Sequence, residues 1–244
     1  MPSVSSPLID LHDVAYAAEG KQILSGVTIR ADERRIGIVG RNGSGKTSLA
    51  RVMAGLIPAD QGRVRIDGVD VAQDRRAALR RVGILFQNPD HQIIFPTVEE
   101  EIAFGLTQMG LSKSDVKRGV HDVLRRFDKL HWAPAAIHQL SQGQRQLVCL
   151  MSVLCMVPKV IILDEPFAGL DIPTTRQLER VLASLDLTIV HITHAPDAVR
   201  AYDRVLWIDQ GRVLQDGAPL PVLAAFSRRM MEIGDSDDLS DLAG

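Results

Sequence analysis

The segment from residue 40 to residue 47, with the sequence GRNGSGKT, restricts the fold more than any other part of the chain. It fits the pattern GxxxxGK[ST], an apolar run at 36–39 precedes it, and a helix is predicted from Lys46 to about Met53. Glycines let the backbone turn tightly around a phosphate, and the start of a helix directs N–H groups at an anion. A chance match would lack the flanking strand and helix, so the sequence predicts a phosphate-binding loop.

Two side chains of this loop carry specific predictions. Lys46 is predicted to reach the β- and γ-phosphates of a nucleotide, and the Thr47 hydroxyl is predicted to ligate Mg²⁺. The candidate nucleotide-binding residues of the segment are Gly40, Asn42, Gly43, Ser44, Gly45, Lys46, Thr47 and Ser48.

A second motif ends an apolar strand predicted at 160–163, where Asp164 and Glu165 follow in sequence. Asp164 is predicted to hold Mg²⁺, often through water, and Glu165 to orient or deprotonate an attacking water. A strand that simply ends in solvated charge is the alternative. The phosphate loop elsewhere in the chain favours the functional interpretation.

Two further polar residues, Gln87 and His194, each follow an apolar strand. The carboxyl ends of parallel strands line the ligand crevice, so these side chains are candidates to contact Mg²⁺, water or a γ-phosphate. For either residue alone, a satisfied loop residue is the simpler interpretation. His191 lies inside its strand and is predicted to be part of the core.

The segment 140–144, LSQGQ, lies between these motifs in the chain. Gly143 permits close backbone approach, and Ser141 and Gln144 have the spacing of a capping box, which predicts a helix starting near Ser141. Such a helix would direct free N–H groups at a phosphate. Taken alone, the pentapeptide predicts no more than a helix cap.

The alternation of strands and helices along the chain predicts an α/β core with a mainly parallel sheet. Turns at 19–21 and 67–68 predict antiparallel hairpins, and the run 97–157 reads as a helical insertion. Three capping boxes are expected, at Thr97, Ser112 and Ser141, and a further helix is expected over residues 176–185. The acidic end from residue 234 to residue 244 is expected to be a loose tail. The predicted divisions are a flexible leader at 1–7, a nucleotide-binding core with an antiparallel β part at 8–87 and 145–220, a helical subdomain at 88–144, and a C-terminal helix with an acidic tail at 221–244.

Composition excludes several classes of protein. The 244 residues carry a net charge of −2 and only 4% aromatic side chains, which disfavours a nucleic-acid binder. The start has neither the basic nor the apolar part of a signal peptide, and the most apolar run, 147–163, is interrupted by polar residues and a proline. Cys149 and Cys155 have no metal-ligand spacing, so buried thiols in a reducing, cytoplasmic compartment are expected.

Together the motifs resemble those of the ATP-binding cassette (ABC) ATPases over about residues 8–220. The phosphate loop, Gln87, the 140–144 segment, the acidic pair at 164–165, the segment 168–171 (AGLD) and His194 occur in that family's order. The resemblance implies the ABC ATPase fold. That fold is an α/β, RecA-like P-loop NTPase core with an inserted helical subdomain and an N-terminal antiparallel β subdomain.

The resemblance also implies a head-to-tail dimer that binds two ATP molecules with Mg²⁺ at its interface. Its catalytic residues would be Glu165 as general base, His194 as the switch residue on the γ-phosphate, and Gln87; its metal ligands would be Thr47, Gln87 and Asp164. Ser141, Gly143 and Gln144 would bind the γ-phosphate held by the opposite subunit, and Asp171 would communicate across the interface. Tyr16 is the candidate that stacks on adenine, and the alternative is that Ala18 occupies the family's aromatic position.

Two positions depart from the family's pattern. Gln142 stands where the family commonly has Gly, and Ala195 follows His194 where an acid is common. We expect neither change to abolish hydrolysis.

A narrower resemblance lies in the segment 87–105, which is similar to the ATPases of energy-coupling-factor importers for vitamins or for cobalt and nickel. There it forms the groove for the coupling helices of a transmembrane subunit, and Asp90, Gln92 and Phe95 are the candidate contacts. The resemblance thus implies a peripheral protein at the cytoplasmic face of the cell membrane, linked indirectly to a substrate-binding membrane subunit. The alternative interpretation is that segment 87–105 is an ordinary subdomain surface. Within this group of importers, the short C-terminus is more similar to the dedicated biotin-importer ATPase than to the longer shared ones, which favours biotin as substrate.

Two other functions compete with transport. A soluble ABC ATPase acting on DNA or ribosomes would carry a coiled-coil insertion or a second cassette, and the chain has neither. A small-molecule kinase with a phosphate loop would leave the segments 140–144 and 168–171 unexplained. Whether the dimer contains two copies or a paralogue stays open.

Overall fold

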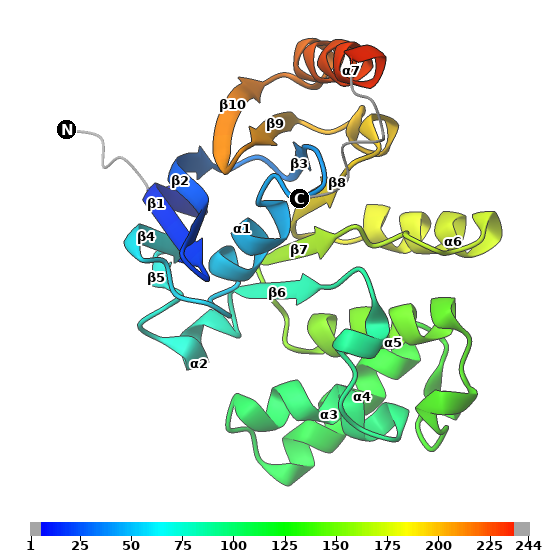
Figure 1. Cartoon of the computed structure of the whole chain (residues 1–244). Coiled ribbons are helices and arrows are strands. Elements are labelled where there is room, and N and C mark those ends of the chain that lie inside the picture. Colours follow the sequence, from blue (N-terminus) through cyan, green and yellow to red (C-terminus); the bar gives the residue numbers. More distant parts are fainter. Residues whose placement is uncertain (1–5, 237–244) are drawn as a thin grey trace.

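The apolar run before the phosphate-loop pattern is one strand of a six-stranded sheet in the computed structural model, which describes residues 6–236 (Figure 1). The strand order is β10-β9-β3-β8-β7-β6, and all neighbours are parallel except β10, which pairs antiparallel with β9. β7 and β8 are buried along their whole length, as expected of apolar strands covered on both faces. The bounds are β3 Arg35–Val39, β6 Val82–Leu85, β7 Val160–Asp164, β8 Thr188–Thr193, β9 Arg204–Asp209 and β10 Arg212–Gly217.

A second, antiparallel sheet has the order β2-β1-β4-β5. Both predicted hairpins form, because Glu19-Gly20 and Asp67-Gly68 take positive φ at both positions, the geometry of two-residue hairpin turns. The bounds are β1 Ile9–Ala18, β2 Lys21–Ala31, β4 Gln61–Ile66 and β5 Val69–Asp70.

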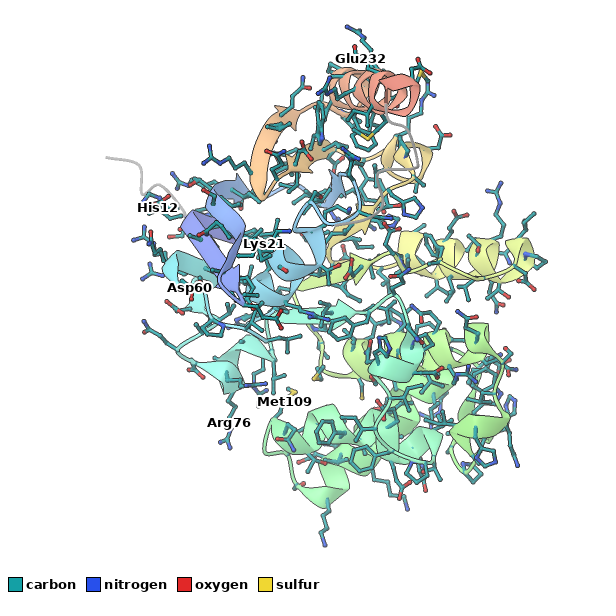
Figure 2. The ribbon with its side chains drawn as sticks, in the orientation of Figure 1. His12, Lys21, Asp60, Arg76, Met109 and Glu232 are labelled. Carbon is teal, nitrogen blue, oxygen red and sulfur yellow. The ribbon has the colours of Figure 1, made fainter. Side chains whose placement is uncertain are left out.

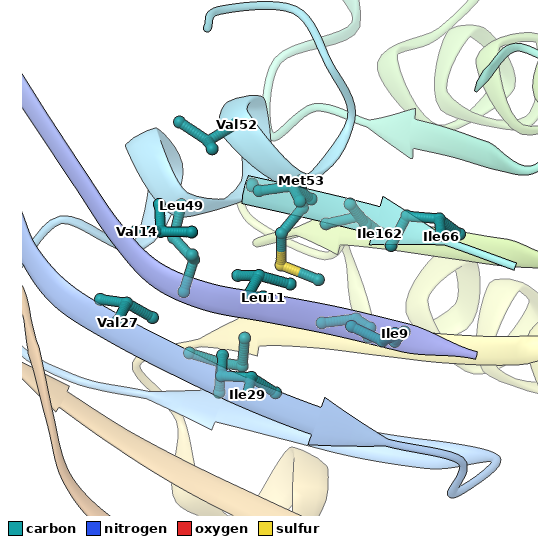
Figure 3. Close-up of a cluster of buried hydrophobic side chains, with 14 of the residues drawn as sticks. Ile9, Leu11, Val14, Val27, Ile29, Leu49, Val52, Met53, Ile66 and Ile162 are labelled. Carbon is teal, nitrogen blue, oxygen red and sulfur yellow. The ribbon is translucent and has the colours of Figure 1, made fainter. Parts of the chain in front are cut away.

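The helix that follows the phosphate loop, α1 (Lys46–Met53), is held between these two sheets. Its Leu49 and Met53 are buried in a cluster with Ile9 and Leu11 of β1 and Ile162 of β7 (Figure 3). This packing fixes the position of the loop relative to the carboxyl ends of the parallel strands.

The helical part gathers at the β6 side of the parallel sheet (Figure 1). It contains α3 (Val98–Gln108), α4 (Lys113–Arg126) and α5 (Gln142–Cys155), whose apolar faces form one core with β7 and β8. In Figure 2, Met109, just after α3, and Glu232 of α7 lie beyond opposite edges of this sheet. The remaining elements are α2 Arg75–Ala78, α6 Ile172–Ala183, α7 Pro219–Ser236 and the 3₁₀ turns η1 Pro89–His91, η2 Leu130–Trp132, η3 Ile137–Gln139 and η4 Pro196–Val199.

Several local predictions need correction. The expected capping box at Thr97 does not form, because its hydroxyl bonds the Glu100 side chain and not a backbone N–H. Ser112 caps α4 by accepting a hydrogen bond from the Asp115 N–H. The Asp115 carboxylate, however, accepts a hydrogen bond from the Ser112 hydroxyl and not from the Ser112 N–H, so of the three positions only Ser141 makes a full capping box. The helix expected at 176–185 begins at Ile172, because Asp171 caps it.

The C-terminal helix extends further than the sequence predicts. The prediction of a loose tail from Gly234 is wrong for residues 234–236, which belong to α7. Residues 1–5 of the predicted leader and 237–244 of the predicted tail lie outside the described residues.

Both cysteines are free thiols of α5, and burial raises the pKa of Cys149 to about 12. Among residues 6–236, no helix combines the length and the apolar character needed to cross a membrane. The division between core and helical subdomain at residue 144 stays a prediction.

Candidate functional site

The phosphate loop leaves the carboxyl end of β3 and enters α1 through two left-handed glycines. Gly43 has a φ of 76° and Gly45 a φ of 100°. At Gly45 a Cβ atom would also lie 2.8 Å from the Ile23 carbonyl oxygen, so the site requires glycine. Gly45 is the N-cap of α1 and supplies no capping side chain, and the first turn carries no acidic residue. The N-terminal N–H groups and the helix dipole therefore favour an anion here.

The Lys46 ammonium lies inside this loop. The side chain is buried, and Nζ donates hydrogen bonds to the carbonyl oxygens of Gly40 at 2.8 Å and Arg41 at 2.7 Å. Burial lowers the pKa of Lys46, while the nearby carboxylates of Glu165 and Asp164 act in the opposite direction. A fixed positive charge thus stands where the sequence predicts phosphates.

A side chain of the loop, Ser44, also fits a bound phosphate. The Ser44 hydroxyl is buried and has no hydrogen-bond partner among the described residues. A buried hydroxyl without a partner is costly, and a phosphate oxygen would satisfy it. The loop's residues therefore fit the triphosphate of a nucleotide.

The predicted magnesium ligands are brought to the same place. Burial raises the pKa of Asp164 at the end of β7, and a hydrogen bond from the Thr47 side chain partly offsets this. Gln87, exposed after β6, faces the same cavity. A hydroxyl, a carboxylate and an amide oxygen are the hard donors that Mg²⁺ prefers, so the donor set fits this ion. Within residues 6–236, no group of three or more His, Cys, Asp or Glu side chains is placed to hold a metal ion.

One cavity of about 360 Å³ collects these groups from the ends of several parallel strands. This confirms the expectation that polar residues following separate strands meet at one edge of the sheet. The lining residues are Ile23, Asn42, Gly43, Gly45, Lys46, Thr47, Ser48, Gln87, Asp164, Glu165 and His194.

The Glu165 carboxylate is held by two residues of the neighbouring strand end. His194 Nδ1 lies 2.7 Å from Oε1, and the Thr193 hydroxyl donates to Oε2 at 3.3 Å. Glu165 itself has a φ of 50°, a left-handed conformation that costs a non-glycine residue about 1–2 kcal/mol. Thr193 is not among the predicted site residues, and its only signal in the sequence is its place beside His194 at the end of β8.

The segment 140–144 lies outside this cavity. Ser141 caps α5 by accepting a hydrogen bond from the Gln144 N–H, and the Gln144 side chain accepts one from the Ser141 N–H. A Cβ atom on Gly143 would lie 2.3 Å from Thr174 of α6, so this glycine allows α5 and α6 to approach closely. Gln142, which departs from the family pattern, extends its amide toward the Ala168 carbonyl at 3.5 Å.

Two other predicted site residues also lie away from the cavity lining. Asp171 is exposed and caps α6. Tyr16 is half-buried in β1 and does not line the cavity, whereas the apolar side chain of Ile23 does. A single chain therefore unites the phosphate loop, Gln87, the acidic pair and His194. It leaves Ser141, Gly143, Gln144, Asp171 and Tyr16 elsewhere, and the roles expected for them stay predictions.

His191, the other histidine of β8, is a core residue as predicted. Its Nδ1 lies 3.0 Å from the Tyr202 hydroxyl, and burial lowers its pKa from 6.5 to about 4. Between these two values the unfolded chain binds a proton that the folded chain does not, so stability falls as the pH decreases. We expect protonation of His191 in the unfolded chain to lower the free energy of unfolding by about 2 kcal/mol when the pH decreases from 7 to 5.

Urea unfolding at these two pH values measures the effect. His191→Phe should lack that part of the pH dependence, and His12→Phe, at an exposed position of β1, should retain it. An unchanged pH dependence in His191→Phe would show that His191 is not the titrating group.

Comparisons with known proteins place these features in a family. Residues 25–168 match the family model described as ABC transporter. The biotin transport ATP-binding protein BioM of Rhodobacter capsulatus is 48% identical over 225 residues, which cover 92% of this chain and 96% of that protein. EcfA1 of Ligilactobacillus salivarius, an energy-coupling factor transporter ATP-binding protein, is 36% identical over 217 residues, which cover 86% of this chain and 77% of that protein.

A solved structure gives the same result for the fold. The cbiO1 protein of Clostridium perfringens, part of the ABC transporter complex cbiONQ, superposes with a TM-score of 0.75 at 29% identity. The superposition covers 94% of this chain and 95% of that chain. The predicted architecture, a P-loop core with an antiparallel β part and a helical part, is confirmed.

Proposed function

Because this chain belongs to the ABC transporter family of ATP-binding proteins, we propose that it hydrolyses ATP to power an energy-coupling-factor type importer, with biotin as the imported substrate. The observation that carries the proposal is the single cavity in which Lys46, Thr47, Gln87, Asp164, Glu165 and His194 meet. The 48% identity to a biotin transport ATP-binding protein supports biotin.

In this proposal the chain's own groups bind the triphosphate and activate water. The loop N–H groups, the Ser44 hydroxyl and the Lys46 ammonium bind phosphate oxygens. Thr47, Asp164 and Gln87 would hold Mg²⁺, which neutralises phosphate charge when bound. Glu165, fixed by Thr193 and His194, orients the attacking water and accepts its proton at a carboxylate oxygen.

The nucleotide site is completed by a second subunit. Ser141, Gln144 and Asp171 are exposed and lie outside the cavity of their own chain. In a head-to-tail dimer the partner's copies of these residues would meet the γ-phosphate. Closure on ATP and opening after hydrolysis would then supply the motion that drives transport, since ATP binds the two states with different affinity.

A groove between the core and the helical part is the proposed docking site for the membrane subunit. It has a volume of about 230 Å³ and a mainly apolar lining that includes Ile84, Ile94, Phe104 and Met156. The buried Glu101 carboxylate accepts hydrogen bonds from the N–H groups of Ile94 and Phe95 at 2.8 and 3.0 Å, which fixes the rim of the groove.

The three contacts expected from the sequence are engaged within the chain. Asp90 lies 3.1 Å from Arg145 Nε, Gln92 accepts a hydrogen bond from the Phe86 N–H, and Phe95 packs on Phe104 at a centroid distance of 5.2 Å. The apolar side chain that the groove leaves most open is Ile94, with 68% of its surface exposed. Ile94 is not among the predicted contacts, because the exposure of a side chain depends on the fold.

Ile94→Asp is therefore expected to weaken binding of the membrane subunit by about tenfold or more, because a charge would face an apolar partner surface. ATP affinity should stay unchanged, since Ile94 is not part of the nucleotide cavity. Co-purification from detergent-solubilised membranes measures the first, and a fluorescent ATP analogue the second. Leu214→Asp, which also replaces an exposed aliphatic side chain by a carboxylate but lies on β10, is the matched control, and equal loss in both variants would contradict the assignment.

Purification of the tagged chain from its native membranes tests the function itself. The proposal predicts an integral membrane partner, ATP hydrolysis by the complex and bound biotin identified by mass spectrometry. Bound cobalt or nickel would assign a metal importer of the same group. Recovery of RNA or DNA without a membrane protein would overturn the transport function.

A further inference from the structure

Gln146 is a buried polar residue that the proposed chemistry does not use. It lies in the first turns of α5, just after the 140–144 segment, and only 1% of its surface is exposed. Its Nε2 donates hydrogen bonds to the carbonyl oxygens of Phe86 at 3.1 Å and Pro166 at 3.3 Å. These two residues directly precede Gln87 and directly follow Glu165, so one amide connects both catalytic loops to one helix.

Packing does not explain an amide at this position. The following residues of α5, from 147 to 151, are all apolar and buried in the helical core, so an amide is the exception in this stretch. The Gln146 Oε1 atom is buried without a hydrogen-bond partner among the described residues, which destabilises the fold. The two donated bonds are what the glutamine adds.

Each of the two carbonyls belongs to a segment that also makes other hydrogen bonds, so a movement of Gln146 would be passed on to its neighbours. The Phe86 N–H donates to Gln92 Oε1 at 3.1 Å, so Phe86 is held at both backbone groups. Pro166 follows the left-handed Glu165, whose N–H donates to the Ile192 carbonyl at 3.0 Å. A shift of α5 would therefore act on both ends of the catalytic cavity through one side chain.

We propose that Gln146 is a positioning residue that fixes Gln87 and Glu165 relative to each other and to the 140–144 segment. The inference rests on the proposed ATPase function. It acts on turnover and not on nucleotide binding, because Gln146 contacts neither the phosphate loop nor Lys46. Movement of the helical part during dimer closure would pass to both catalytic loops through this amide.

Gln146→Met, which keeps the size of the side chain and removes both donors, is expected to lower kcat about tenfold, or about 1.4 kcal/mol in the activation barrier. The Kd for ATP should stay within about twofold, which is less than about 0.5 kcal/mol. Gln146→Asn is one methylene shorter and keeps an amide that cannot reach both carbonyl oxygens, so it should also lower kcat. This variant serves as the test if Gln146→Met does not fold.

A second substitution separates positioning from general destabilisation. Val148→Ala, at a fully buried position of the same helix, should lower Tm at least as much as Gln146→Met and leave kcat per folded molecule unchanged. Normal kcat in Gln146→Met, or an equal loss in both variants, would overturn the proposal. A raised KM with unchanged kcat would overturn it as well.

A double-mutant cycle with Glu165→Gln gives the decisive readout. If Gln146 acts through Glu165, Gln146→Met should have little further effect on the residual rate of the Glu165→Gln variant. An equal factor in both backgrounds would contradict the positioning role. Absence of ATPase activity in the unsubstituted chain would instead overturn the proposed function, so the two failures are distinguishable.

Discussion

Replacement of Glu165 by Gln is expected to lower kcat for ATP hydrolysis by about 10²–10³-fold, because the amide cannot accept a proton from the attacking water. Affinity for ATP should be retained, since the loop N–H groups and Lys46 are unchanged. The substitution keeps the size of the side chain, and the neighbouring Thr193 and His194 can still hydrogen bond to it. The loss therefore reports on chemistry and not on the shape of the cavity.

Single-turnover phosphate release measures the rate, and light scattering measures the second consequence. With hydrolysis blocked, ATP-bound dimers should accumulate, with twice the 26.7 kDa mass of one chain. Glu179→Gln, a carboxylate of α6 that pairs with Arg176, is the control and should turn over normally. Normal turnover in Glu165→Gln would show that another group acts as the base.

Replacement of Lys46 by Ala is expected to weaken ATP binding by about 100-fold or more, since charge-assisted hydrogen bonds to phosphate contribute about 1.5–3 kcal/mol. The effect should be large because Lys46 is only 7% exposed and its ammonium is held inside the loop by two carbonyl oxygens. The substitution also removes the donor to the Gly40 and Arg41 carbonyls, which loosens the loop itself.

Isothermal calorimetry with ATP checks this result. Lys46→Met keeps the apolar stem of the side chain and should lose affinity to a similar degree, which separates charge from packing. Lys159→Ala, at an exposed position before β7, should bind ATP normally. Unchanged affinity in both Lys46 variants would refute the assignment of the phosphate loop.

The parts of the fold that were predictable depend on short stretches of chain. Apolar runs, the glycine pattern at 40–47 and the turn at Asp67-Gly68 specify strands, the loop and a hairpin through local geometry. The gathering of Gln87, Asp164 and His194 followed from one topological rule, because side chains after parallel strands meet at one edge of the sheet.

The parts that were not predictable depend on contacts between distant segments. Gln146 reaches across 60 residues to Phe86 and across 20 residues to Pro166, and no local pattern reports such bonds. The left-handed conformation of Glu165 and the exposure of Ile94 likewise follow from packing. The start of α6 was missed for a different reason, because Asp171 was interpreted only as an interface residue and not as a helix cap.

In the proposed dimer, ATP is bound by two subunits at once, each of which supplies residues that the other cannot place. The most direct test is a structure of the Glu165→Gln variant trapped with ATP and Mg²⁺. Each triphosphate should contact Lys46 of one subunit and Ser141 and Gly143 of the other. A nucleotide enclosed by a single chain, with segment 140–144 of the neighbour directed away from it, would contradict binding across the interface.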